Sequence, residues 1–141
     1  MVAFVAFIEG EVLAREVGQI TSTEGRVDIK RGNSEEAVRL KEDQAVQVGD
    51  VIRTKTGSRT EITFSDKTIV RIAPDSRVCI ERYDLDENGN RETANLRLFR
   101  GKMRAIVSKS GPSESFNILT PGAKGTAKGT DIFAFYQADS T

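Results

Sequence analysis

Apolar and polar residues alternate along most of the chain, in short runs separated by glycine, asparagine and charged residues. A two-residue period places successive side chains on opposite faces of a β-strand, so each run can bury one face. No window shows the 3.6-residue period of an amphipathic helix, and the predicted class is therefore all-β. The pattern predicts strands at residues 19–21, 26–30, 37–40, 45–48, 51–54, 60–64, 68–72, 77–83, 94–99, 102–107, 116–119 and 131–136.

The predicted strands are short and their turns are closely spaced, which suits a sandwich, a barrel or a stacked solenoid. One unit recurs loosely: a glycine, a short alternating strand with a basic residue, and a turn, beginning at Gly25, Gly57, Gly101 and Gly129. Such units favour a single domain with a coiled or solenoid-like β-sheet, and a β-sandwich is the alternative. With 141 residues one domain is expected, and we place it at residues 17–141.

Residues 1–16 form a separate N-terminal segment. Its apolar run at residues 2–8 is much shorter than the about 20 residues that cross a bilayer, so we expect no stable membrane insertion. The run resembles the end of a secretory signal whose basic start is missing, but it also suits an edge strand. Both interpretations stay open.

The charge balance and the histidine and cysteine content exclude several classes of function. The chain has 21 Lys+Arg and 21 Asp+Glu, and this zero net charge removes the long-range attraction that nucleic-acid binding needs, so no nucleic acid is expected as a partner. It has no histidine, which excludes Ser-His-Asp and Cys-His catalysis and imidazole metal sites. The single cysteine, Cys79, cannot form an intramolecular disulfide and is expected half-buried on a strand. We predict no catalytic residue, metal ligand or cofactor.

Several short sequence segments, which follow one another in the same order as in the family, resemble a FecR-type domain. Together they cover roughly residues 17–137. They lie at residues 24–27, 48–54, 57–58, 64–68, 72–76, 96–104, 116–121 and 128–133. The chain departs from the family pattern at Lys128, where the family more often has an arginine, and Gly125-Thr126 nearly copies Gly129-Thr130.

The resemblance implies a non-enzymatic signalling or protein-interaction module that works in the periplasm or otherwise outside the cytoplasm. Its expected partner is an envelope or receptor-type protein, and self-association is a further expectation because the apolar run at residues 2–8 needs cover. The alternative function is a calcium- or carbohydrate-binding β domain of a cell-envelope protein. An enzyme that uses only carboxylates is the weakest alternative, because no acidic pair is marked by its context.

The motif residues are expected to be structural. At Gly49-Asp50, glycine suits a turn and aspartate can accept freed backbone N–H groups. Thr120-Pro121 is expected to end a strand, and Gly129-Thr130 to form a tight turn. The structural motif residues of the domain are Gly49, Asp50, Thr54, Gly57, Pro74, Gly101, Thr120, Pro121, Gly129 and Thr130.

Residues 84–89 resemble the start of a calcium loop, with oxygen-bearing side chains at Asp84, Asp86 and Asn88 before a glycine. The twelfth position is Asn95, where a bidentate glutamate is needed. Asn88-Gly89 is also a strong hairpin signal, and a plain hairpin is the preferred interpretation.

Three other patterns bear on chemistry. The glycine-rich stretch 121–130 lacks the spacing of a phosphate-binding loop, although a backbone anion nest remains an alternative. Ser108 and Lys109 are adjacent, so on a strand they would point to opposite faces. Four basic residues are expected to line one face that is either solubilising or attractive to an acidic partner: Arg97, Arg100, Lys102 and Arg104.

Overall fold

The structure is a computed structural model that describes residues 15–32, 34–127 and 131–136. The apolar run at 2–8 and the turn predicted at Gly129-Thr130 lie outside the described residues. The strands are β1 (Glu16–Glu24), β2 (Val27–Lys30), β3 (Ala37–Arg39), β4 (Ala45–Gln47), β5 (Val51–Thr54), β6 (Arg59–Phe64), β7 (Ile69–Ile72), β8 (Arg77–Leu85), β9 (Arg91–Ile106), β10 (Phe116–Thr120), β11 (Ala123–Thr126) and β12 (Asp131–Tyr136), with one short 3-10 helix, η1 (Ser113–Ser115).

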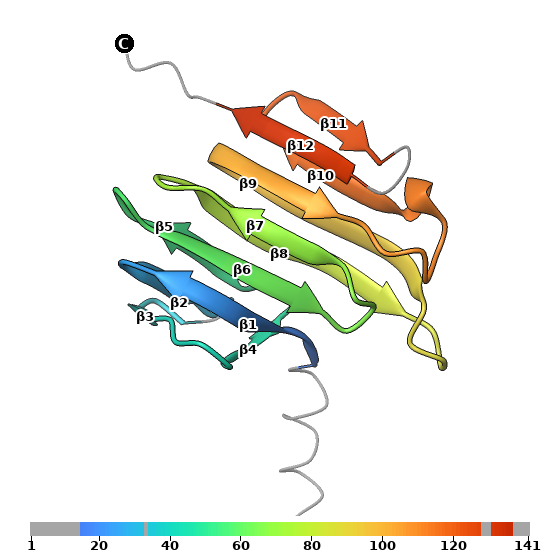
Figure 1. Ribbon diagram of the computed structural model, residues 1–141, viewed down its shortest axis with the longest axis horizontal. Coiled ribbons are helices and arrows are strands. Elements are labelled where there is room, and N and C mark those ends of the chain that lie inside the picture. Colours follow the sequence, from blue (N-terminus) through green and yellow to red (C-terminus); the bar gives the residue numbers. More distant parts are fainter. Residues whose placement is uncertain (1–14, 33, 128–130, 137–141) are drawn as a thin grey trace, which may run out of the picture.

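The strands form one twelve-stranded sheet that curls so that its two halves face each other (Figure 1). The front half has the order β4-β1-β6-β7-β9-β12, and the back half has the order β3-β2-β5-β8-β9-β10-β11. All pairings are antiparallel except that of β10 with β9, which is parallel. The all-β prediction is confirmed, and the coiled form of the sheet is this curled arrangement.

The long strand β9 joins the two halves. Its first part pairs with β8 in the back half, and its last part pairs with β7 and β12 in the front half. The sequence predicts two strands here, at 94–99 and 102–107, but one strand continues through Gly101, which has the positive φ of 97°. A side chain at Gly101 would lie 2.0 Å from the Ser76 hydroxyl, so glycine alone allows this close approach.

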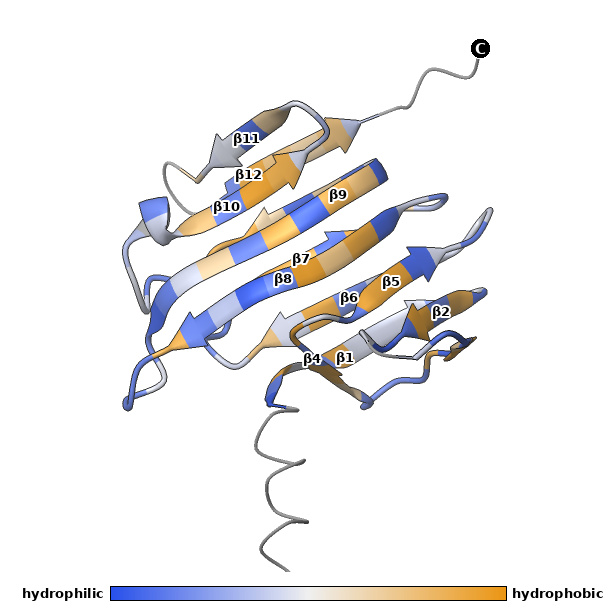
Figure 2. Cartoon of the chain, turned by 180° about the vertical axis from the view of Figure 1, so that it is seen from behind, coloured by the Kyte–Doolittle hydropathy of each residue, from blue (hydrophilic) through white to orange (hydrophobic). Residues whose placement is uncertain are grey.

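The core lies between the two halves. Apolar residues alternate with polar ones along β8 and β9, as Figure 2 shows. Ile62, expected in the core, is 1% exposed. The rings of Phe64 and Tyr83 stack with centroids 4.3 Å apart, which joins the two halves because β6 lies in the front half and β8 in the back half.

A buried ion pair, absent from the sequence predictions, closes one end of the core. The side chains of Asp66 and Arg91 are both 0% exposed, and Arg91 Nη1 lies 2.7 Å from Asp66 Oδ2. The Tyr83 hydroxyl donates to Asp66 Oδ1 at 2.8 Å. Burial, followed by the nearby Asp66 charge, raises the pKa of Tyr83, so the phenol stays protonated as a donor.

Candidate interaction surface

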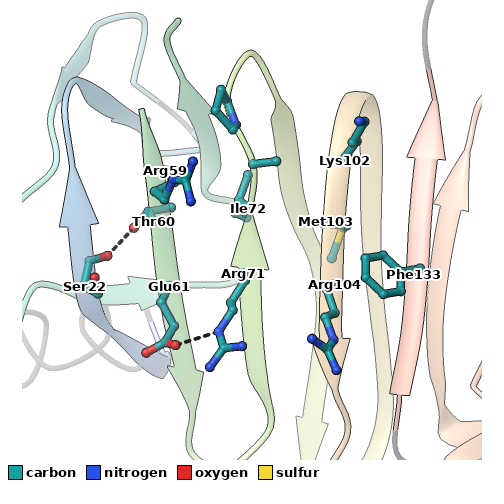
Figure 3. A pocket seen from close by; sticks show the side chains of 12 residues that line it. Ser22, Arg59, Thr60, Glu61, Arg71, Ile72, Lys102, Met103, Arg104 and Phe133 are labelled. Atoms are coloured by element: carbon teal, nitrogen blue, oxygen red, sulfur yellow. Dashed lines mark hydrogen bonds and ion pairs between the residues drawn. The ribbon is translucent and has the colours of Figure 1, made fainter. Parts of the chain in front are cut away.

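A hollow of about 440 Å³ lies on the front half of the sheet (Figure 3). Strands β1, β6, β7, β9 and β12 and the turn after β7 supply its walls. Its size is within the range of small-ligand sites. Its lining residues are Ser22, Arg59, Thr60, Glu61, Arg71, Ile72, Ala73, Pro74, Lys102, Met103, Arg104 and Phe133.

Among the described residues, four cations and one carboxylate, Glu61, line the hollow. Three of the cations, Arg59, Arg71 and Arg104, pair with carboxylates, so the excess positive charge is that of Lys102. Arg71 Nε lies 3.0 Å from Glu61 Oε2, and this hydrogen bond lowers the pKa of Glu61 despite partial burial. Arg104 pairs with Asp131 at 2.8 Å and lowers the pKa of that carboxyl in the same way. Both carboxylates therefore stay ionised at neutral pH.

Exposed aromatic side chains border the hollow on β12. Phe133 is 73% exposed and Phe135 is 60% exposed, whereas Ile132, Ala134 and Tyr136 pack against the core. Arg104 lies 5.4 Å from the Phe133 ring centroid, and Lys102 lies 5.3 Å from that of Phe135. Aromatic side chains and arginine are enriched at protein interfaces.

The outer edge of β12 is the second feature of this surface. Within the part of the chain that the structure describes, β12 is hydrogen-bonded to β9 alone. The opposite edge of its backbone therefore presents donors and acceptors to which another strand can pair. The exposed phenylalanines lie on the same strand, so the edge and the aromatic patch form one continuous surface.

Among the predicted motif residues that the structure describes, Pro74 alone lines the hollow. Thr54 and Gly101 gather with it at the turn after β7, where the Thr54 hydroxyl donates to the carbonyl of Ala73 at 2.6 Å. Gly57 has φ 70° in the turn before β6. Thr120 and Pro121 belong to the β10–β11 hairpin, where Thr120 pairs with Ala123.

Gly49-Asp50 forms a buried turn. Gly49 has φ 97° and donates its backbone N–H to the carbonyl of Ile80 at 2.7 Å. Asp50 is 1% exposed, and its Oδ2 accepts from the backbone N–H of Gln47 at 2.8 Å and from Arg31 at 2.6 Å. Burial nevertheless raises the pKa of Asp50. The carboxyl thus ties the turn together instead of facing solvent.

The loop that resembles a calcium site is the hairpin between β8 and β9, as the preferred interpretation predicts. Asp86 Oδ1 accepts the backbone N–H groups of Asn88 and Asn90, both at 2.9 Å. Asp84 Oδ2 pairs with Arg82 at 2.6 Å. Among the described residues, no group of three or more His, Cys, Asp or Glu side chains is arranged to hold a metal ion.

The expected single basic face is split in two. Arg97 and Arg100 lie opposite β8 residues in the back half, whereas Lys102 and Arg104 lie opposite β12 residues in the front half. The sequence prediction fails because β9 crosses between the halves at Gly101. Arg71 and Phe133 of the front surface also carried no sequence signal, since their neighbours come from other strands.

The fold and its charged, aromatic surface define an all-β domain with an open strand edge. In a comparison with protein families, the model of the FecR protein family matches residues 50–141. The chain belongs to this family. The family is one of signalling regulators associated with the cell envelope and generally without enzymatic activity. No curated protein and no solved structure matches the chain significantly. Within the described part of the chain, no helix is long and apolar enough to cross a membrane.

Proposed function

We propose that this domain is a non-enzymatic signalling or protein-interaction module that acts in the periplasm or otherwise outside the cytoplasm. It binds an extended segment of an envelope or receptor-type protein along β12. The observation that carries the proposal is the pair of exposed phenylalanines, Phe133 and Phe135, on an edge strand beside Lys102 and Arg104.

Strand addition explains why these features occur together. Main-chain hydrogen bonds to the β12 edge would provide affinity for any extended segment, and alternate side chains would provide specificity. Phe133 and Phe135 bury little of their surface in the domain itself, so a partner gains apolar contact there. Lys102 lies beside Phe135 and makes no ion pair among the described residues, so it favours an acidic side chain in that partner.

A binding role suits the carboxylates at this surface better than catalysis. A general acid needs a raised pKa to stay protonated near neutral pH. The pKa values of Glu61 and Asp131 are instead lowered by their arginine partners. Asp50 has a raised pKa but is buried away from solvent.

Site-specific photocrosslinking in the full-length protein, in its own cells, tests the proposal. A photoreactive phenylalanine analogue replaces Phe133, and the matched control carries it at Val38, a 53% exposed residue on another edge strand, β3. We expect one discrete covalent adduct with an envelope protein at position 133 and none at 38. Equal labelling at both positions, or none at 133, would contradict the proposal. A covalent adduct between two copies of this chain would show that the partner at β12 is a second copy of the chain and not a receptor-type protein.

A further inference from the structure

A row of arginines crosses the outer face of the back half of the sheet. Arg53 on β5 lies directly opposite Arg77 on β8, and Arg77 lies directly opposite Arg100 on β9. All three side chains are exposed, while their neighbours Ile52 and Val78 face the core. Like charges at directly opposite positions of a sheet are destabilising, so this arrangement lowers stability.

The fold does not neutralise this row. Among the described residues, Arg53, Arg77 and Arg100 make no ion pair and no side-chain hydrogen bond. On the front half, by contrast, Arg59, Arg71 and Arg104 each pair with a carboxylate. These pairs are Arg59–Glu24, Arg71–Glu61 and Arg104–Asp131.

The nearby carboxylates are already engaged. Asp28 lies opposite Arg53, but it pairs with Arg26 at 2.9 Å and with Lys55 at 3.8 Å. Asp75 accepts a hydrogen bond from the Thr56 hydroxyl at 3.0 Å. Neither forms an ion pair with the row.

The row borders a second hollow, of about 540 Å³, that Lys55 and Asp75 also line. The lining thus includes four cations and one carboxylate. Arg77 lies over the ring of Phe99 at 4.9 Å from its centroid, which holds the guanidinium while leaving its N–H edges to donate. Planar guanidinium groups with such edges recognise carboxylates with paired hydrogen bonds.

We infer that this arginine row binds a short acidic peptide segment of a protein partner, with Asp or Glu at alternate positions. Neighbouring strands are about 4.8 Å apart, so the three arginines span about 10 Å. Alternate residues of an extended peptide lie about 6.7 Å apart on one side, and two or three such carboxylates can meet the long, flexible arginine side chains. The short row and the zero net charge of the chain argue against a nucleic acid, which needs a longer basic track.

Fluorescence anisotropy with the full chain tests this inference. The probe is a short labelled peptide of alternating Glu and Ser, and the control peptide has Gln in place of Glu. At about 50 mM salt, where screening is weak, we expect the Glu peptide to bind and the Gln peptide not to. Arg77→Gln should weaken binding about tenfold, as expected for loss of one charge-assisted contact, and Arg53→Gln should act in the same direction.

Two control variants separate this surface from the rest of the molecule. Arg82→Gln removes an exposed arginine of the same strand, paired with Asp84, and should change affinity less than twofold. Phe133→Ser alters the front surface and should leave peptide binding intact. The proposal for β12 and the proposal for the arginine row are therefore tested independently. Arg77→Gln should also melt no lower than the natural chain at low salt, because it relieves repulsion.

Four results would overturn the inference: no binding of the Glu peptide, equal binding of the Gln peptide, equal loss of affinity in Arg77→Gln and Arg82→Gln, or tighter binding of a single-stranded oligonucleotide of matched charge. The last result would assign the row to nucleic acid.

Discussion

Replacing Arg91 by alanine should strongly destabilise the domain. Among the described residues, Arg91 is the largest fully buried side chain, and its partner Asp66 is equally inaccessible. The guanidinium also holds the segment that leads from β9 to β10. Its Nη2 donates to the carbonyl oxygens of Ser108, Gly111 and Pro112 at 3.1, 3.2 and 3.1 Å.

The cost follows from what the truncation leaves behind. Removing one partner of a buried ion pair leaves an uncompensated charge, which costs about 3–5 kcal/mol. The carbonyl oxygens that lose their donor add to this, unless water enters the space. Since a domain is stable by only about 5–15 kcal/mol, the variant should lose a large fraction of its stability.

Urea unfolding followed by circular dichroism measures the effect. With a slope of about 2 kcal/mol per M, a loss of about 4 kcal/mol lowers the midpoint by about 2 M. The matched control is Arg82→Ala, which breaks an exposed pair with Asp84 and should cost less than about 1 kcal/mol.

A double-mutant cycle identifies the cause. Asp66→Ala and Arg91→Ala destroy the same interaction, so the double variant should be more stable than the sum of the single effects predicts, by about 1–3 kcal/mol. Additive effects, or a loss below about 1 kcal/mol in Arg91→Ala, would refute the reasoning that the pair holds this end of the core.

Four further predictions concern a core residue, an ion pair, the single thiol and the loop that resembles a calcium site. Ile62→Ala should cost about 2–5 kcal/mol in the same unfolding assay, because Ile62 is 1% exposed; an unchanged midpoint would contradict its placement. Arg71 lowers the pKa of Glu61 in the folded chain, so the stabilisation from this pair is present above the unfolded pKa and disappears as pH falls through the folded one. The stability difference between the natural chain and Glu61→Gln should therefore shrink on acidification in pH-dependent melting, and a widening gap would reverse the assigned sign. Burial raises the pKa of the Cys79 thiol, so iodoacetamide should alkylate it more slowly at pH 8 than an unstructured cysteine peptide; equal rates would contradict this. Millimolar calcium should leave the melting temperature unchanged, because Asp84 is paired with an arginine; a rise abolished by Asp84→Ala would instead support the calcium-binding alternative.

Local pattern was sufficient to predict most of the strands. Alternation such as that around Ile62 reports which residues face the core, because the two-residue period is a property of the strand itself. Turns such as Asn88-Gly89 were equally evident, since their backbone conformation depends on a few adjacent residues. The sequence pattern does not predict the strand β11 (Ala123–Thr126), because its glycine and lysine carry no apolar alternation.

Pairing between distant strands was decided only by the tertiary structure. Nothing near Asp66 or Arg91 in the sequence indicates that they meet in the core, 25 residues apart. Likewise, the sheet register places Arg53 opposite Arg77, and the crossing of β9 at Gly101 divides the basic residues between two faces. The physical reason is that strand periodicity is local, whereas register and curling depend on long-range packing of side chains from many strands.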